Sequence, residues 1–478
     1  MTADHPILSI LAACLATCLT VCLAGCSDEP PEQSGGTSNA TDRSAPTQAD
    51  RPTTQDETDA GPWVVDATDR ARLDFKHFAG LTGRYYYVEI VPPGCALFDY
   101  DNDGDLDVYF VQGRVLEPGK STEDAFTDYP NDEIRLGNRL YRNDTIRDGV
   151  NTGELRFTDV TEESGAGIVG YGMSVTTADF NGDAHTDIFI TNFGPDVLLL
   201  NNGDGTFRDV SASSGLDDPR WTTAATTVDF DLDGDLDLFV GLGGDFTIET
   251  APSCERKPGV PDYCAPAALA GVPDRLYMND GNGVFTDVSD RLSPTTEGHA
   301  LGAVVADFDN NGWPDIYVAN DGDANHLWLN TDGRFEESAL LNSAAYNDMG
   351  QAEAGMGIAI ADYDDDGDED LFLTHLRGET NTLYKNDGNA LFTDTTVREG
   401  LSAPSRPYTA FGVGFIDADH DADLDVFIAN GDVRANDLDV SGVFPYDQPN
   451  QFMRNDGNNT FTDISEIDKQ AKYYRKMQ

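Results

Sequence analysis

Six short segments of this 478-residue sequence carry acidic residues at alternating positions. They read DYDNDGDLD (99–107), DFNGDAHTD (179–187), DFDLDGDLD (229–237), DFDNNGWPD (307–315), DYDDDGDED (362–370) and DADHDADLD (417–425). In such a segment the side-chain oxygens at positions 1, 3, 5 and 9 converge on one point, and the backbone carbonyl of position 7 adds another oxygen. Ca2+ binds about six to eight oxygens at roughly 2.3–2.6 Å, and water can complete the shell. The spacing therefore predicts up to six structural calcium sites, here numbered loops one to six in chain order.

The candidate ligands are the acidic and amide residues at these positions. Loops one to three offer Asp99, Asp101, Asp103, Asp105 and Asp107; Asp179, Asn181, Asp183 and Asp187; and Asp229, Asp231, Asp233, Asp235 and Asp237. Loops four to six offer Asp307, Asp309, Asn311 and Asp315; Asp362, Asp364, Asp366, Asp368 and Asp370; and Asp417, Asp419, Asp421 and Asp425. Asp105, Asp235 and Asp368 stand at position 7, where the ligand is the backbone carbonyl.

Position 6 makes the sharp turn of the loop, for which glycine is best suited. Loops one, three and five have Gly104, Gly234 and Gly367 there, so we expect them to bind most strongly. Loop four follows, because Asn311 replaces one carboxylate. Loops two and six are expected to be weakest, since Ala184 and Ala422 replace the glycine. The alternative is a set of acidic turns without metal, which six clusters of mutually repelling carboxylates make less favourable.

The elements that must position these loops are short strands. Each loop follows an apolar run with small residues, such as GMGIAIADY, and precedes a second apolar run, such as LDVYFV. An LY-x-N element, an NDG or DG turn and an F-T-D-V element complete the unit. Period-2 runs bounded by Gly, Asn and Asp predict strands and hairpins, and four strands in a unit of about 50 residues predict a propeller blade. The fold is therefore expected to be all-β, a β-propeller with six calcium-loop units.

The repeat resembles the FG-GAP/VCBS family of integrin-like β-propellers, and more narrowly the cartilage acidic protein and ASPIC/UnbV group. The narrower resemblance rests on FKHFAGLTGRYYYVEIVPPGCALFDYDNDGDLD, which opens the first unit, and on a Cys…Cys insertion followed by PDRLYMNDGNGVFTDV in the third. It covers residues 62–465 and implies a further unit, often with a C-terminal ASPIC/UnbV domain. This chain instead ends in a short basic tail, 466–478.

Closure of the ring is a separate expectation. The segment at 63–68 looks like the F-T-D-V-T element that ends each unit, but no unit precedes it. We therefore expect six complete blades plus an orphan strand, in an open seven-fold or a strained six-fold ring, and a truncated reading frame. The alternative is a native six-bladed ring in which residues 63–68 pack at an edge.

The N-terminus carries an apolar run at 7–26 that ends in Leu23-Ala24-Gly25-Cys26. This resembles the lipobox of bacterial lipoproteins, which implies a signal peptide at 1–25 and lipidation of Cys26. The alternative is an uncleaved transmembrane anchor. Residues 26–61 are rich in Pro, Ser, Thr and acidic residues, which predicts a disordered tether. The protein is therefore expected outside the cytoplasm, at the bacterial cell envelope, with the lipid as its only membrane contact.

Cys254 and Cys264 lie in one insertion, SCERKPGVPDYC. In an oxidising compartment they are expected to form a local disulfide. The alternative is a pair of free thiols.

The charge and the missing motifs restrict the function. A formal net charge of −56 argues against nucleic acid and against a polybasic membrane contact. No HExxH, G-x-S-x-G, P-loop or haem-attachment motif is present. We expect a non-catalytic binding, adhesion or scaffold module for a glycan or protein partner. The alternative is a calcium-dependent polysaccharide lyase or hydrolase, whose catalytic groups would come from the non-repeat segments 111–138 and 243–273.

Overall fold

A computed structural model describes residues 67–127, 130–147, 149–216, 218–433, 446 and 448–465. The predicted signal peptide, Cys26, the tether and the tail 466–478 lie outside these residues. No helix in the described part of the chain is long and apolar enough to cross a membrane.

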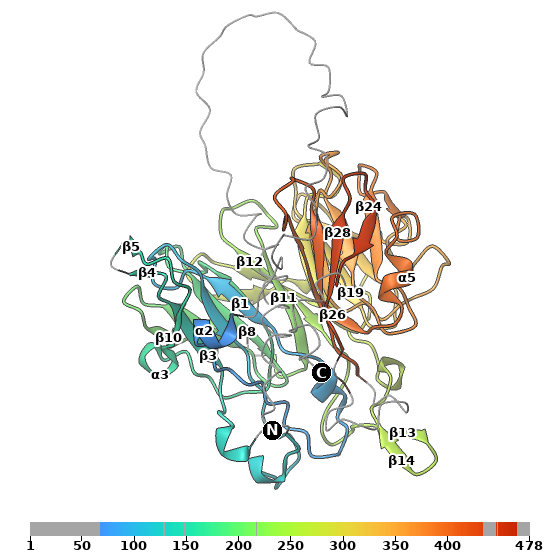
Figure 1. The fold of residues 1–478 in the computed structure, drawn as a ribbon. Coiled ribbons are helices and arrows are strands. Elements are labelled where there is room, and N and C mark those ends of the chain that lie inside the picture. The colour runs from blue at the N-terminus through green and yellow to red at the C-terminus, as the bar shows by residue number, and fades with distance from the viewer. Residues whose placement is uncertain are drawn as a thin grey trace, which may run out of the picture.

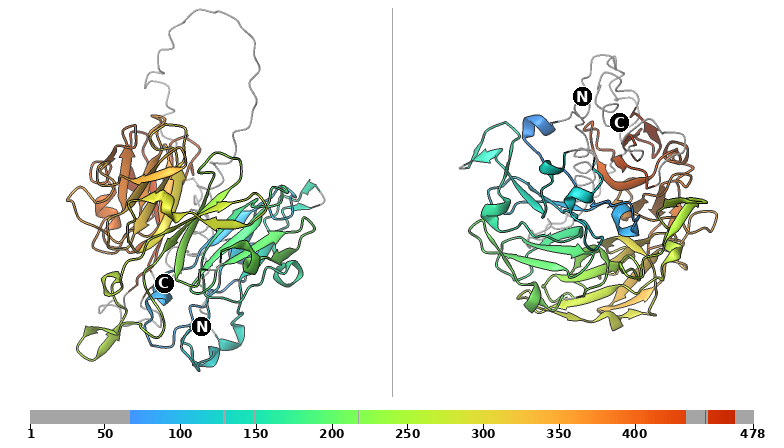
Figure 2. Two further views of the ribbon diagram at one scale, coloured as in Figure 1. Left: turned by 180° about the vertical axis from the view of Figure 1, so that it is seen from behind. Right: turned by 90° about the horizontal axis from the view of Figure 1, so that it is seen from below.

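The described residues form six antiparallel sheets that follow one another around a ring (Figures 1 and 2). Blades one to three contain β1 (Cys95–Phe98), β2 (Asp107–Phe110), β3 (Arg139–Asn143) and β6 (Phe157–Asp159); β7 (Gly172–Ala178), β8 (Asp187–Asn192), β9 (Val197–Asn201) and β10 (Phe207–Asp209); and β11 (Thr222–Val228), β12 (Asp237–Leu242), β15 (Arg275–Asn279) and β16 (Phe285–Asp287). Blades four to six contain β18 (Ala300–Ala306), β19 (Asp315–Asn320), β20 (His326–Thr331) and β21 (Arg334–Glu337); β22 (Ile358–Ala361), β23 (Asp370–Leu373), β24 (Thr382–Asn386) and β25 (Phe392–Asp394); and β26 (Ala410–Ile416), β27 (Asp425–Asn430), β28 (Gln451–Asn455) and β29 (Phe461–Asp463). The prediction of an all-β propeller is confirmed.

The remaining elements are short. Blade four has a fifth strand, β17 (Leu292–Ser293), parallel to β21, and two small hairpins pair β4 (Ile146–Arg147) with β5 (Val150–Asn151) and β13 (Cys254–Lys257) with β14 (Val260–Asp262). The short helices are α2 (Thr68–Ala71), α3 (Thr161–Ser164), α4 (Ser211–Ser214), α5 (Ser402–Ser405), η1 (Tyr87–Ile90), η2 (Thr122–Asp124), η3 (Asn131–Glu133), η4 (Pro266–Ala268) and η5 (Ser289–Arg291).

The second strand of each blade is an unbroken apolar run because both of its faces are covered. Every residue of β8, β12 and β19 is buried. Alternate residues of such a strand enter two different cores: Tyr109 packs between blades one and two, whereas Phe110 packs on the other face of blade one. Similar cores lie between all later pairs of consecutive blades.

The first strand of each blade is innermost, and its small residues fit the crowded centre. A Cβ on Gly357, just before β22, would lie 1.7 Å from the carbonyl oxygen of Phe411 in β26. Contacts between innermost strands run from β1 through β7, β11, β18 and β22 to β26. Among the described residues, β26 and β1 make no comparable contact.

At this closing point the structure describes only the end of the 63–68 segment. Thr68 begins α2, just as Thr161 and Ser211 begin α3 and α4 after the F-T-D-V and F-R-D-V elements, which agrees with the resemblance of 63–68 to that element. Residues 63–66 lie outside the described part, and their pairing stays a prediction. The segment after α2 covers the free face of blade one, where Leu73 and Phe75 are buried and the Phe75 ring stacks on Phe110 at 4.4 Å.

Candidate calcium loops on one face of the propeller

All six aspartate loops join the innermost strand of a blade to its second strand, so they emerge on the same face of the ring. The aspartate at position 9 is in each case the first residue of the second strand, and it is buried. The strand therefore fixes one candidate ligand, and the hairpin turn carries the others.

Positions 1 and 9 are held by the backbone. In loop one, Asp99 Oδ1 accepts from the Asp103 N–H (3.1 Å) and Asp99 Oδ2 from the Gly104 N–H (2.9 Å). Asp107 Oδ2 accepts from the Tyr100 N–H (2.9 Å) and Asp107 Oδ1 from the Asn143 N–H (2.7 Å). The other five loops repeat all four bonds. Hydrogen bonds to its own carboxylates therefore hold each loop in shape without a cation.

Five of the loops bring three carboxylates together, with one oxygen from each within 4.8 Å of the others. The groups are Asp99, Asp101 and Asp107; Asp229, Asp231 and Asp237; Asp307, Asp309 and Asp315; Asp362, Asp364 and Asp370; and Asp417, Asp419 and Asp421. Loop six gathers Asp421 in place of Asp425. Loop two, where Asn181 replaces a carboxylate, forms no such group of acidic residues.

Two of these carboxylates carry an oxygen that is buried and has no hydrogen-bond donor among the described residues. They are Asp231 Oδ1 and Asp364 Oδ1, both at position 3. A buried acceptor without a donor is costly, and a cation would supply the missing partner. The residues therefore fit calcium: positions 1, 3, 5 and 9 would hold it, and the ion would neutralise charge and fasten the first hairpin of each blade.

Burial also raises the pKa of the position-9 carboxyls, although the two backbone N–H donors work against it. The pKa rises to about 8 for Asp107 and Asp370, to about 7 for Asp237 and Asp315, and to about 6 for Asp187 and Asp425. Burial and the neighbouring charges of Asp103 and Asp99 raise the pKa of Asp101 to about 6. A bound cation would favour the ionised forms of these groups.

The turn requires two left-handed residues, one more than the sequence suggested. At position 6, φ is +94° for Gly104 and +96° for Gly234, while Ala184 and Ala422 adopt +67° and +75°. Position 4 is left-handed too, in Asn102, Gly182, Leu232, Asn310, Asp365 and His420. The signal was available, because four of these six are Asn, Asp or Gly, which tolerate positive φ best.

The asparagine of the LY-x-N element fastens neighbouring blades, a role that sequence analysis missed. Its side-chain amide donates to the carbonyl at position 2 of the preceding blade's loop. These bonds are Asn201 to Tyr100 (2.8 Å), Asn279 to Phe180 (2.9 Å), Asn330 to Phe230 (2.8 Å) and Asn386 to Phe308 (2.9 Å). Asn143 of blade one donates to Leu106 of its own blade instead (3.0 Å).

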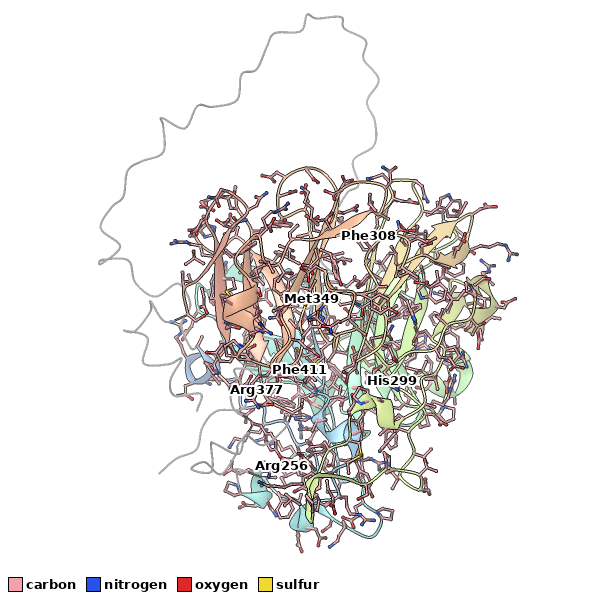
Figure 3. The ribbon with its side chains drawn as sticks, turned by 90° about the vertical axis from the view of Figure 1, so that its right-hand side faces the viewer. Arg256, His299, Phe308, Met349, Arg377 and Phe411 are labelled. Carbon is pink, nitrogen blue, oxygen red and sulfur yellow. A yellow bond between two sulfur atoms is a disulfide. The ribbon has the colours of Figure 1, made fainter. Side chains whose placement is uncertain are left out.

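The opposite face is built from segments that do not repeat. Residues 111–138 connect β2 to β3, and residues 243–274 connect β12 to β15. In Figure 3, Phe308 of loop four lies toward one end of the molecule and Arg256 of the β13–β14 hairpin lies at the other. Cys254 and Cys264 form the predicted disulfide at the base of this hairpin, with their Cα atoms 5.2 Å apart. We call this side the insertion face.

Helix η1 fills the centre of the insertion face. The Tyr87 hydroxyl donates to Asp321 of blade four, and the Tyr87 ring meets Trp221 edge-on at 5.5 Å. Glu89 is buried; its Oε2 accepts from the Tyr86 N–H (3.2 Å) and from the Tyr263 hydroxyl (3.4 Å). The run of aromatic residues before β1 thus forms a plug that contacts distant blades, which the sequence did not reveal.

Six blades of four or five strands, each opening with an aspartate hairpin, define the class of this protein as a repeat-built β-propeller. Comparison with known proteins agrees, since the FG-GAP-like repeat family matches residues 179–240, 263–318, 307–373 and 362–428. Cartilage acidic protein 1 of Xenopus tropicalis is 25% identical over 177 residues, covering 35% of this chain and 26% of that protein. The chain is therefore a β-propeller that contains FG-GAP-like repeats, and its match spans about a quarter of the length of that relative.

Among solved structures, the likenesses are distant. An Agrocybe aegerita lectin that recognises non-reducing terminal N-acetylglucosamine is 18% identical with a TM-score of 0.34, covering 63% of this chain and 64% of its own. A putative 6-phosphogluconolactonase from Bacteroides uniformis is 12% identical with a TM-score of 0.39, covering 75% of this chain and 80% of its own.

Proposed function

We propose that this propeller is a calcium-stabilised, non-catalytic binding or scaffold module that works outside the cytoplasm and is held to a bacterial envelope by a lipid on Cys26. The observation that carries the proposal is the set of five carboxylate groups on one face, each with its oxygens within 4.8 Å. Calcium at these loops joins two strands of each blade and stabilises the folded ring, because it binds the native loop geometry.

The insertion face is where we place the partner. The loop face repeats the same hairpin from blade to blade, whereas the opposite face combines unlike segments: the plug, the disulfide hairpin and residues 111–138. Phe126, in the last of these, is 63% exposed. An exposed aromatic ring among polar residues suits contact with a glycan or with a protein side chain. Calcium then acts at a distance, by holding the blades that carry this face.

A binding assay tests this role. The detergent-solubilised full chain is applied to a glycan array and to immobilised envelope extract, in calcium and in chelator. We expect calcium-dependent capture that Phe126→Ala weakens by about tenfold while the thermal midpoint is unchanged. Release of reducing or unsaturated sugar from any array polysaccharide would instead favour a lyase or hydrolase. Capture that is equally strong after chelation would contradict the calcium dependence.

The location rests on two features. The disulfide between Cys254 and Cys264 is of a kind that persists in oxidising compartments. The apolar run ending at Cys26 resembles a lipobox. Metabolic labelling with a radioactive fatty acid tests the anchor: we expect label in the wild type and none in Cys26→Ser. Label retained by Cys26→Ser would contradict lipidation at this residue.

A further inference from the structure

Loop five differs from the others in having a lysine that hydrogen-bonds two of its candidate ligands; in loop three, Arg291 Nη1 approaches one candidate ligand, Asp231 Oδ2, at 3.6 Å. Lys385 lies on β24, and its Nζ donates to Asp364 Oδ2 and, at 2.7 Å, to Asp366 Oδ2. Asp364 and Asp366 are positions 3 and 5 of the loop; the backbone occupies only one of their oxygens, Asp366 Oδ1, which accepts from the Asp368 N–H (3.1 Å). The side chain of Asp364 is only 5% exposed, so this contact lies within the loop.

The residues at the matching position of the other blades donate no hydrogen bond to a loop carboxylate among the described residues. Blades two, three and four have Leu200, Met278 and Leu329. Blades one and six have arginines, but each turns toward the aspartate two residues ahead. Arg142 Nε donates to Asp144 (3.0 Å), and Arg454 Nε donates to Asp456 (3.0 Å).

Blade five has the same aspartate, Asp387, yet Lys385 does not bond it. Asp387 accepts from the Thr393 hydroxyl (2.6 Å), a bond that the corresponding aspartates of blades one and six make in addition to their arginine contact. A lysine carries its donors only at the end of a flexible stem, whereas the arginine Nε lies closer to the backbone. The lysine therefore extends to the loop carboxylates. In blade five the basic residue pairs with Asp364 and Asp366 of the loop, whereas in blades one and six it pairs with the aspartate two residues after it.

The ammonium group supplies one positive charge and N–H donors to carboxylates that a divalent ion would otherwise bind. A divalent ion bound to the same carboxylates would face this positive charge at close range. Calcium can enter loop five only after Lys385 leaves.

We propose that Lys385 is the resident cation of loop five, and that this loop is neutralised without calcium while the other carboxylate loops depend on the metal. This inference rests on the proposed function for those other loops. It reverses the order of calcium affinity expected from the ligand types alone, in which loop five was among the loops expected to bind calcium most strongly. Calcium affinity at loop five is expected to be lower than at loops one and three by on the order of 10- to 100-fold.

The test compares Lys385→Met with wild type, and Arg454→Met serves as the matched control because Arg454 bonds no loop carboxylate. In chelator, Lys385→Met should lower the thermal midpoint by a few degrees, since Asp364 and Asp366 lose their cation. Calcium should then restore the midpoint. Equilibrium dialysis at about 0.1 mM calcium should count one more bound ion per chain in Lys385→Met than in wild type, and no change in Arg454→Met.

The outcomes separate the two proposals. An unchanged midpoint of Lys385→Met in chelator overturns the role of Lys385, whatever calcium does. Equal calcium counts in wild type and Lys385→Met, with wild type binding several ions, also overturn it and leave the calcium proposal standing. A wild type that binds no calcium, together with a destabilised Lys385→Met, overturns the calcium proposal alone.

Discussion

The carboxylates of one loop have different structural roles, although all of them are aspartates. Asp237 is buried and gives both oxygens to backbone donors, the N–H groups of Asn279 (2.8 Å) and Phe230 (3.3 Å). Asp233 in the same loop is exposed and accepts only from the Asp235 N–H (3.0 Å). Position 9 therefore holds the hairpin together, whereas position 5 is available to a metal.

This division predicts opposite behaviour of two substitutions in loop three. In chelator, Asp233→Ala should cost less than about 0.5 kcal/mol, because the side chain is exposed. Asp237→Ala should cost about 2–3 kcal/mol, because two backbone donors lose their acceptor. In calcium, both should lose part of the metal-dependent stabilisation. Urea unfolding with and without calcium measures all four values, and equal costs in chelator would contradict the division.

Backbone strain in loops two and six predicts a stabilising change. Ala184 holds a left-handed φ of +67°, which disfavours any residue with a Cβ. Ala184→Gly should therefore raise the free energy of unfolding by up to about 1 kcal/mol. The reverse change in loop three, Gly234→Ala, should lower it by about 1 kcal/mol, since no atom lies within 4 Å of the added Cβ and only the backbone cost remains.

Urea denaturation of both variants in chelator provides the measurement. A loss of stability in Ala184→Gly would show that the loop does not store this strain.

At the scale of the elements, the strands and loops of the blades repeat, whereas the plug formed by η1 occurs once. Each second strand, LY-x-N strand and aspartate hairpin follows the repeated pattern, and these could be predicted because burial and turn chemistry are local. The asparagine bonds between blades and the position of η1 depend on contacts between residues about 80 to more than 200 positions apart, such as Tyr87 with Asp321. No periodicity in the sequence encodes such contacts.

The plug predicts a pH dependence through Glu89. Burial, opposed by the Tyr86 N–H and the Tyr263 hydroxyl, raises the pKa of Glu89 to about 8 from an ordinary value near 4.5. Between these two values the folded protein keeps a proton that the unfolded chain releases. The stability that Glu89 contributes is therefore full below about pH 4.5 and is lost as the pH rises through 8. Glu89→Gln cannot titrate and should lose less stability over this range.

Thermal midpoints from pH 5 to 9 in saturating calcium isolate this contribution, because the loop carboxylates are the same in both proteins. Parallel curves for the wild type and Glu89→Gln would contradict it.

At the scale of the whole molecule, the six blades form a sequence of similar interfaces with one exception. Five pairs of consecutive blades share a buried core, and the free face of blade one is covered by the segment that follows α2. The number of described blades followed from the repeat, and so did the place of each aspartate loop between the first two strands of its blade. The cation proposed for loop five could not be predicted from the repeat, because it depends on the direction in which the side chain of Lys385 extends from β24.

The central claim is that calcium holds this ring together, and the thermal midpoint of the wild-type protein tests it most directly. The midpoint is measured in millimolar calcium, in the same concentration of magnesium, and in chelator at matched ionic strength. Each loop that is saturated a hundredfold above its dissociation constant adds about 2.7 kcal/mol to the free energy of unfolding. We therefore predict a midpoint at least several degrees higher in calcium than in chelator, with magnesium close to chelator. The same midpoint in calcium and in chelator would contradict the claim.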